Sequence, residues 1–382
     1  SLKKINNLSY EEKKKDYLKI QKLITKQKKI QESNLYYFDK IYWHVENCKK
    51  FGTLPFAGLA RCGFIAIEII DSFVREKVLS HKEKYDFLNS ISTISTELAN
   101  DYVKLNKSKF ISKYGHLRPN SYEINSPNYK EGFDKYFKTK KKILVTKKKF
   151  KFSKQQKIKI KKFIKKFNKK LSFNEFLIFL KESITFREYS KFIFMKSVDL
   201  IFENLKLFAK KYRINFNDLS YLKINDLTDF YYNLSSEMAS KDIQKMIKQN
   251  KEDYFKNYNL DLPDIILSPR DLFVSEVGMD NPNYITDKEC YGEITELNIN
   301  KKIHISNKIV CIENADPGFD FIFSHKIKGL ITKYGGFNSH MSIRCSELGI
   351  PAIIGVGENN YKNIINSRKI AFKCKDKSFK IL

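Results

Sequence analysis

The sequence predicts a multidomain protein of the α plus α/β class, in which a mainly helical domain precedes a C-terminal α/β domain. Three observations support this class. From 34 to 256, apolar residues recur at helical spacing. Over 257–283, Pro and Gly residues punctuate the chain and the helical period stops, which predicts a hinge. From 284 to 382, short apolar runs alternate with turn residues and shorter helical patterns. A chain of 382 residues is long enough for such an arrangement.

Helical elements come first. Residues 1–33 mix charged and apolar residues at helical spacing, and we expect an exposed helix or an interdomain linker. Residues 56–73 are nearly apolar and predict a buried central helix. Arg61 interrupts that helix, so it must pair with a carboxylate or contact an anionic substrate. Residues 173–212 predict another long helix, whose apolar face Arg187 and Glu188 interrupt.

The stretch 113–129 breaks the helical pattern with Gly, two Pro and several Asn and Ser residues. It predicts a long loop that is either functional or slack. Its side chains could hydrogen-bond a ligand, and the candidates are His116, Arg118, Tyr122 and Glu123.

Residues 138–170 contain seventeen lysines interleaved with apolar residues. The solvated face of an amphipathic helix explains them most simply, and docking on a membrane surface or a polyanion is the alternative. The whole chain carries a net charge of +29. The excess is Lys scattered among Ile, Asn, Phe and Tyr, as an AT-rich genome alone would produce, so we do not expect nucleic-acid binding.

The most specific chemistry lies in 309–357. Short buried strands are predicted at Ile309–Ile312 and Gly329–Thr332, and the Gly335-Gly336 pair predicts a turn that a Cβ would resist. Two further strands are expected at Gly292–Leu297 and His304–Ile305.

A helix follows that turn, with Asn338 or Ser339 as N-cap and Gly349 as the residue that ends it. His340 therefore sits in the first helical turn, where free N–H groups and the helix dipole favour an anion. A neutral imidazole is a competent nucleophile near pH 7, so this placement suits a phosphohistidine. The alternative is a histidine at a helix start without chemistry.

The string GG-x-x-SH, followed nine residues after His340 by GIPAIIG, resembles the phosphohistidine swivelling domain of the phosphoenolpyruvate-utilising enzymes. The segment Asn314–Pro317 resembles the Asp-Pro turn of that family. The resemblance implies that His340 is the phosphocarrier. Asn338, Ser339 and Arg344 are then candidates for contacts to phosphate. Many members carry Arg six positions after the histidine, where this chain has Ser346, and Arg344 could instead pair with Glu347 on the surface.

The resemblance also implies an ATP-dependent phosphotransferase. No Gly-rich phosphate loop occurs in the sequence, so we expect ATP and Mg²⁺ on a separate ATP-binding domain, N-terminal to this region in the full-length chain. The abrupt start at Ser1 fits such a fragment. The chain ends about 40 residues after His340, where the dikinases of the family continue into a barrel, so pyruvate and phosphoenolpyruvate are disfavoured.

Among family branches, the motifs most resemble the bacterial L-glutamine kinases of capsule phosphoramidate synthesis. This predicts ATP, L-glutamine and water as substrates, with glutamine amide-N-phosphate, AMP and phosphate as products. Arg61 or Arg118 would hold the glutamine carboxylate, and His116 or Glu123 would act as base. Arg187 and Glu188 would lie near the acceptor cavity or form a plain buried ion pair.

Two alternatives remain. The enzyme could be like rifampin phosphotransferase or phosphoenolpyruvate synthase with another acceptor, or the chain could be a basic module that binds polyanions. No apolar run approaches the roughly 20 residues of a membrane span and no signal peptide is apparent, so we expect a cytoplasmic protein without a membrane span. Six cysteines without a C-x-x-C pair predict reduced, structural thiols.

Overall fold

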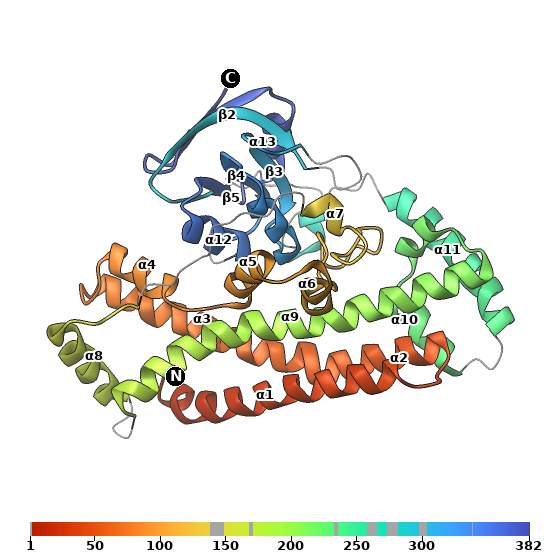
Figure 1. Ribbon diagram of the computed structural model, residues 1–382, viewed down its shortest axis with the longest axis horizontal. Coiled ribbons are helices and arrows are strands. Elements are labelled where there is room, and N and C mark those ends of the chain that lie inside the picture. Colours follow the sequence, from red (N-terminus) through yellow and green to blue (C-terminus); the bar gives the residue numbers. More distant parts are fainter. Residues whose placement is uncertain are drawn as a thin grey trace. The chain divides into compact units, whose positions relative to one another are not determined.

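A computed structural model of the protein describes 2–137, 149–167, 171–232, 236–257, 266–272, 282–297, 304–337 and 339–382. The chain forms two compact units, each built from segments that are distant in sequence (Figure 1). The helical unit comprises Ser1–Leu117 and Lys140–Asn204. The histidine unit comprises Arg118–Thr139 and Leu205–Leu382.

These units divide the chain differently from the continuous segments predicted from the sequence. The loop that begins at Arg118 groups with the C-terminal residues, although it is inserted between helices of the helical unit. Most of the predicted hinge at 257–283 lies outside the described residues, as do 138–148 and 168–170 of the lysine-rich stretch. The domain boundaries and the hinge therefore stay predictions.

In the described residues the helical unit consists of helices and the segments between them. Its elements are α1 (Leu2–Gln31), α2 (Tyr37–Cys48), the π-helix η1 (Lys49–Thr53), α3 (Leu54–Arg75), α4 (His81–Asn89), α5 (Ile94–Lys104), α6 (Lys107–Tyr114), α8 (Lys154–Phe167) and the part of α9 (Phe173–Tyr212) that ends at Asn204.

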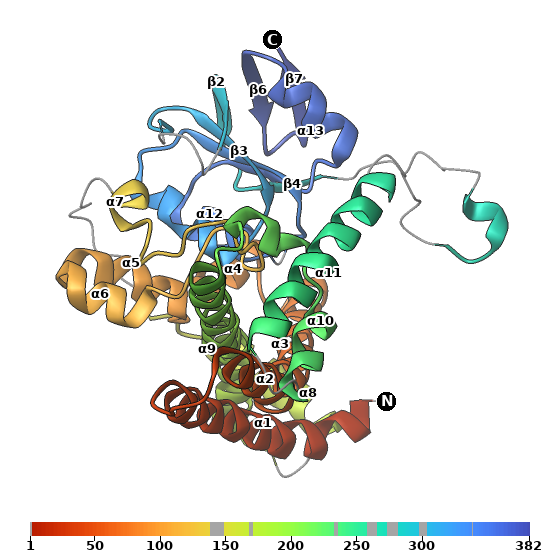
Figure 2. The ribbon, with the colours of Figure 1, turned by 90° about the vertical axis from the view of Figure 1, so that its right-hand side faces the viewer.

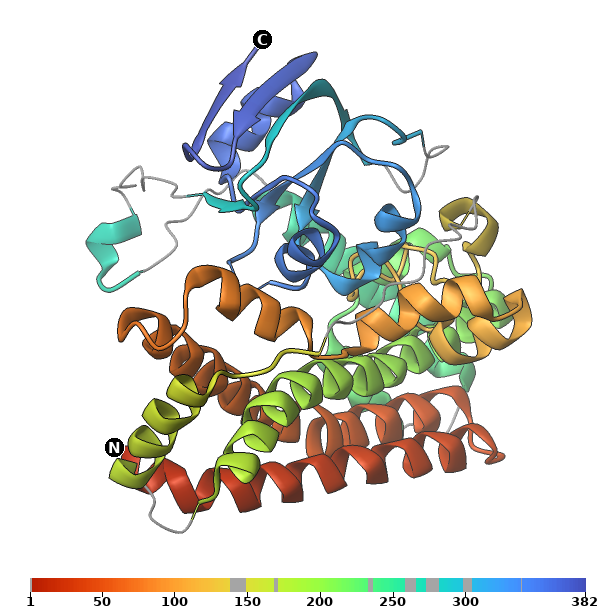
Figure 3. The same cartoon turned by 60° about the vertical axis from the view of Figure 1, so that its left-hand side comes forward.

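Helix α1 runs beside α9, as Figures 1 and 3 both show. Ile20 and Leu23 of α1 are fully buried in a cluster that also contains Leu59 and Phe194. The Tyr17 and Phe186 rings stack at 4.0 Å between centroids. The part of α1 that carries Ile20 and Leu23 thus packs into the core, where an exposed helix or an interdomain linker was expected.

A buried stripe of small polar residues lets other helices approach α9 closely. Ser183, Ser190 and Ser197 are all fully buried and lie seven residues apart, so they share one helix face. Gln27 of α1 donates to Ser197 Oγ at 2.8 Å and to the Ile193 carbonyl at 3.0 Å. On α3, a Cβ at Gly63 would lie 3.3 Å from the Ser183 carbonyl oxygen. Longer side chains at these positions would push the helices apart.

Helix α8 carries the described part of the lysine-rich stretch. Its Ile160 and Ile164 are buried in a cluster with Phe73 and Phe176. Its lysines are exposed. This arrangement is the solvated face of an amphipathic helix that the sequence predicted as the simplest explanation.

The histidine unit contains a mixed sheet with helices on it. Its helical elements are α7 (Phe133–Tyr136), the end of α9, η2 (Phe216–Tyr221), α10 (Ile224–Thr228), η3 (Asp229–Tyr232), α11 (Ser236–Asn257), η4 (Pro269–Leu272), η5 (Pro317–Ser324), α12 (His340–Leu348) and α13 (Glu358–Ile365). Its strands are β1 (Asn283–Ile285), β2 (Glu289–Glu296), β3 (Ile309–Asn314), β4 (Gly329–Tyr334), β5 (Ala352–Ile354), β6 (Lys369–Lys373) and β7 (Ser378–Ile381).

Within the described residues the strand order is β1-β5-β4-β3-β2-β6-β7. Figure 2 labels β4, β3, β2, β6 and β7 of this sheet. The four central strands β2 to β5 are parallel, and the outer strands run antiparallel to their neighbours. Cys311, Ile331 and Ile353 are aligned across β3, β4 and β5 and are fully buried. They pack with Tyr361 and Ile364 of α13 in one core cluster. The α/β class of this region is thus confirmed, although His304–Ile305 is not a strand.

All six cysteines are buried and free in the structure, and their role as reduced, structural thiols stays a prediction. One continuous helical stretch, Tyr37–Arg75, is long and apolar enough to cross a membrane, with a mean hydropathy of 1.6 in its most apolar window. The sequence-based expectation had overlooked this length. Such a stretch is weak evidence for a span, because core helices pass the same test, and α3 packs against α1.

Candidate active site

Helix α12 begins at His340, as the sequence predicted. Ser339 has an extended backbone and its Oγ accepts from the Ser342 N–H at 3.4 Å. Gly349 ends the helix in the left-handed region, at φ +63°. Asn338, the other predicted cap and phosphate contact, lies outside the described residues.

The turn before α12 depends on one of its two glycines. Gly335 has φ +136°, and a Cβ there would lie 2.8 Å from the Ala315 Cβ. A Cβ at Gly336 would meet no atom within 4 Å. The chain therefore requires glycine at the first position for both conformation and space.

A carboxylate that the sequence reasoning missed holds the His340 ring. Asp320 lies in η5, a turn that begins with Asp316 accepting from the Gly318 N–H at 2.7 Å. Asp320 Oδ1 lies 2.7 Å from His340 Nε2. The side chains of His340 and Asp320 are 8% and 2% exposed. Because an ionised carboxylate only accepts, Nε2 is the donor, and the contact fixes both the ring orientation and the tautomer.

Arg344, one turn further along α12, joins the same group. Its Nε lies 3.5 Å from Asp320 Oδ1 and its NH1 donates to Glu347 at 2.6 Å. Burial lowers the pKa of this guanidinium, but the Asp320 and Glu347 carboxylates outweigh that effect and the pKa is raised. The pairing with Glu347 is therefore present, but it is buried, where the sequence had indicated a surface pair.

The Nε of Arg344 is buried and makes no hydrogen bond in the described structure. This donor lies beside the carboxylate that holds His340. A phosphoryl group on the imidazole would bring anionic oxygens to the start of α12, where backbone N–H groups and the dipole also favour negative charge. Arg344 thus remains a candidate for a contact to phosphate.

The one local feature that could have revealed Asp320 is an acidic residue inside an apolar run, Phe319-Asp320-Phe321. A charge in such a run is costly unless it is paired. The partner, however, lies twenty residues further along the chain, so only the fold identifies it.

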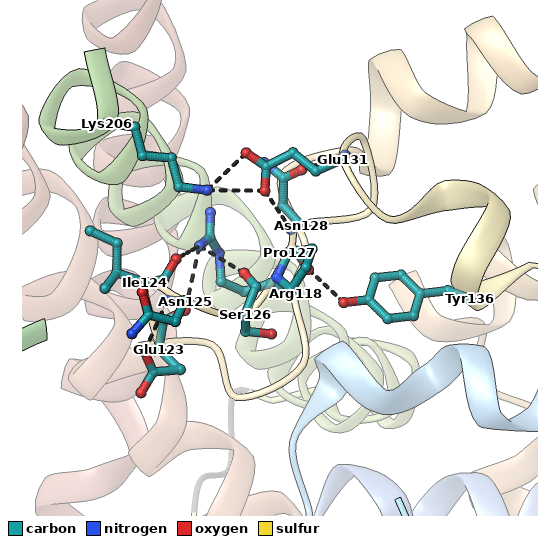
Figure 4. Close-up of polar contacts among 10 residues, drawn as sticks. All are labelled: Arg118, Glu123, Ile124, Asn125, Ser126, Pro127, Asn128, Glu131, Tyr136 and Lys206. Atoms are coloured by element: carbon teal, nitrogen blue, oxygen red, sulfur yellow. Dashed lines mark hydrogen bonds and ion pairs between the residues drawn. The ribbon is translucent and has the colours of Figure 1, made fainter. Parts of the chain in front are cut away.

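Polar contacts, some of them buried, order the loop at 118–137 (Figure 4). Arg118 is 2% exposed, and its NH1 lies 3.2 Å from the Ser126 carbonyl oxygen and 3.5 Å from those of Glu123 and Ile124. Lys206 binds both oxygens of Glu131, at 2.8 and 3.0 Å. These contacts give the loop a defined structure, so it is not slack. Its function stays a prediction.

Arg118 and Glu123, two predicted substrate-binding residues, make hydrogen bonds within this loop. The guanidinium of Arg118 faces backbone carbonyl oxygens, and the Glu123 carboxylate accepts from the Asn125 N–H at 2.9 Å. Their roles in binding an acceptor stay predictions.

The other predicted substrate residues belong to the helical unit. Arg61 is exposed on α3. His116 Nε2 lies 3.0 Å from the Phe192 carbonyl oxygen, so that nitrogen carries the proton. Arg187 and Glu188 form an ion pair at 3.7 Å, and the Arg187 guanidinium lies 5.0 Å from the centre of the Phe64 ring. These contacts fit the plain ion pair, and a substrate contact stays a prediction.

Within the part of the chain that the structure describes, no group of three or more His, Cys, Asp or Glu side chains could hold a metal ion.

Comparison with known proteins supports the reading of the C-terminal region. Residues 305–371 match the profile of the "PEP-utilising enzyme, mobile domain" family. The chain is also similar to rifampicin phosphotransferase of Bacillus cereus, at 26% identity over 165 residues. That match covers 38% of this chain and 18% of the relative, so the chain spans a small part of the relative's length.

Proposed function

We propose that this chain is the carrier and acceptor part of a phosphotransferase, and that His340 carries the phosphoryl group. One observation carries the proposal. His340 begins α12, inside the segment that matches the mobile-domain profile, and a buried carboxylate 2.7 Å from its Nε2 orients the ring. The similarity to rifampicin phosphotransferase supports the same reaction class.

In the proposed reaction, an imidazole nitrogen of His340 attacks the β-phosphorus of ATP. The bond from that phosphorus to the oxygen bridging it to the α-phosphorus breaks, and AMP leaves with the electron pair. Water then removes the terminal phosphate, which leaves a single phosphoryl group on the ring. We propose that ATP binds with Mg²⁺ on a separate domain of the full-length enzyme, as the resemblance of the histidine motif to the phosphoenolpyruvate-utilising enzymes implies.

Within this chain, Asp320 is proposed as a positioning residue. It fixes the ring by accepting from Nε2, and it lies next to the Arg344 guanidinium. When phosphoryl oxygens arrive, Arg344 Nε offers them a donor that makes no hydrogen bond in the unphosphorylated protein.

We propose L-glutamine as the acceptor, on the resemblance of the loop and of the α12 motif to the glutamine-kinase branch. Arg61 is the better candidate for the glutamine carboxylate, since it is exposed while Arg118 is buried among carbonyl oxygens. His116 is the candidate base that accepts the amide proton. A rifamycin is the second candidate acceptor, because the curated relative is a rifampicin phosphotransferase.

The test uses the full-length enzyme and ATP labelled with ³²P at the β-position. His340→Asn should form neither AMP nor acid-labile protein label. His304→Asn, an exposed histidine of the same unit, is the matched control and should behave as the wild type. Acid-labile label that persists on the His340 variant would remove His340 from the mechanism.

The acceptor is tested separately. AMP release is measured with L-glutamine, with other amino acids and with rifampicin. Stimulation by L-glutamine alone supports the proposed acceptor, and stimulation by rifampicin alone replaces it.

A further inference from the structure

The loop at 118–137 makes a set of contacts with η5 that the proposed reaction does not explain. Ser121 Oγ lies 2.8 and 2.7 Å from the two carboxylate oxygens of Asp316. The fully buried Tyr129 donates its hydroxyl to the Gly318 carbonyl oxygen at 2.9 Å. Burial, together with the Asp320 charge, raises the pKa of Tyr129 well above its ordinary value, so the hydroxyl keeps the proton that it donates.

The far end of η5 is held in the same way. His325 Nε2 donates to the Tyr136 carbonyl oxygen at 3.1 Å. The rings of Tyr136 and Phe321 lie 4.6 Å apart between centroids. The loop therefore contacts residues on both sides of Asp320, the residue that holds His340.

Gly318 allows the backbone of η5 to lie directly against the backbone of the loop at Arg118 and Pro119. An ideal Cβ at this position would lie 1.7 Å from the Arg118 carbonyl oxygen and 2.7 Å from the Pro119 nitrogen. Both obstacles are backbone atoms, so no side-chain rotation could relieve the clash. Any residue other than glycine would force the loop away from η5.

We infer that 118–137 is a docking port for η5, which holds Asp320 against His340 while the phosphoryl group is delivered. This inference rests on the proposed function. The loop continues directly from Leu117 and leads on to α8, so both of its ends are tied to the helical unit. A carrier histidine that must also reach a nucleotide elsewhere has to leave such a port, so the polar and aromatic contacts between the loop and η5 would be broken and remade in each cycle.

If 118–137 is a docking port, adding ATP should change its hydrogen exchange. If it is a permanent part of the carrier, ATP should leave that exchange unchanged. In the full-length wild type, ATP added without acceptor draws the histidine to the nucleotide, and backbone amides in 118–137 should exchange with deuterium faster. Exchange that is the same with and without ATP would overturn the inference.

Gly318→Ala tests the contact itself, and Gly292→Ala on β2 is the matched control. The atoms nearest to a Cβ at Gly292 would be side-chain atoms, Lys328 Cδ at 3.1 Å and two carbons of Ile309 at 3.6 Å, which can shift as backbone atoms cannot. In Gly318→Ala, amides in 118–137 should exchange at least tenfold faster. Labelling of His340 from β-³²P ATP should persist, while discharge of that label by L-glutamine should slow at least tenfold. Gly292→Ala should change none of these. Unchanged exchange in Gly318→Ala would refute the port.

Ser121→Ala is the second variant, in case Gly318→Ala fails to fold. It removes both short contacts to Asp316 without adding an atom, and it should also speed exchange in 118–137. Unchanged exchange here counts against the port. A wild-type enzyme that never gains ³²P from β-labelled ATP would refute the proposed function. The hydrogen exchange of 118–137 in the two variants tests the docking contact separately.

Discussion

Asp320 Oδ1 lies 2.7 Å from His340 Nε2, and the same oxygen lies 3.5 Å from Arg344 Nε. One buried carboxylate therefore orients the imidazole and neutralises a guanidinium.

Replacing Asp320 by Asn removes the charge from the contact to Nε2 but nearly keeps its shape. We expect the rate of His340 labelling from ATP to fall at least tenfold, about 1.4 kcal/mol in the activation barrier. The loss should appear in kcat, with KM for ATP unchanged, because Asp320 positions the ring and does not bind nucleotide. Asp376→Asn, at an exposed position of the same unit, is the control. Equal labelling rates for the two variants would contradict the role.

Replacing Arg344 by Met removes the guanidinium that the buried carboxylates of Asp320 and Glu347 face. Removing one partner of a buried ion pair costs about 3–5 kcal/mol. We expect the free energy of unfolding, measured in urea, to fall by that amount. Arg75→Met, which breaks an exposed pair with Glu68, should cost about 1 kcal/mol or less. Similar losses for both variants would show that Arg344 is not paired as described.

The two glycines before α12 should differ in their tolerance of alanine. Gly335→Ala places a Cβ at φ +136° against Ala315, and we expect about 1–3 kcal/mol of destabilisation. Gly336→Ala meets open space and should change stability by about 0.5 kcal/mol or less. Thermal and urea unfolding of the two variants measure the difference, and equal stabilities would refute this account of the turn.

His44 in α2 should make the stability of the protein depend on pH. Burial, with a smaller effect of Lys40, lowers the pKa of His44 to about 4. The unfolded chain therefore binds this proton at a higher pH than the folded one. The stability from the neutral ring is complete above about pH 6.5 and is lost as the pH falls towards 4, by about 3 kcal/mol in all.

The measurement is the free energy of unfolding at several pH values for the wild type and for His44→Gln. The variant should lose less stability between pH 6.5 and 4 than the wild type. His81→Gln, which changes an exposed histidine of the same unit, should follow the wild-type curve. If His44→Gln also follows that curve, the ring is not buried in its neutral form.

Local signals in the sequence predicted much of α12 and its surroundings. The cap at Ser339, the left-handed Gly349 and the strands β3 and β4 each follow from residues within or next to the element itself. Such features depend on nearby backbone chemistry, which the sequence displays directly.

What the sequence could not supply depends on contacts between distant segments. Asp320 meets His340 only because η5 and α12 pack together. The grouping of Arg118 with the C-terminal residues joins positions nearly two hundred residues apart, through contacts such as Ser121 with Asp316. No periodicity or motif encodes a pairing at that range. The acceptor roles of Arg61, His116, Arg118, Glu123, Arg187 and Glu188 remain predictions for the same reason.

The burial of all six thiols has a practical consequence for fluorescence measurements of domain motion. Burial raises the pKa of several of them, to about 11 for Cys48 and Cys290, so they form little thiolate near neutral pH. A maleimide dye should therefore react almost solely with cysteines introduced on the exterior, with no need to strip out native ones. Fluorescent labels placed on the two units could then report, molecule by molecule, whether and how far the carrier travels during turnover.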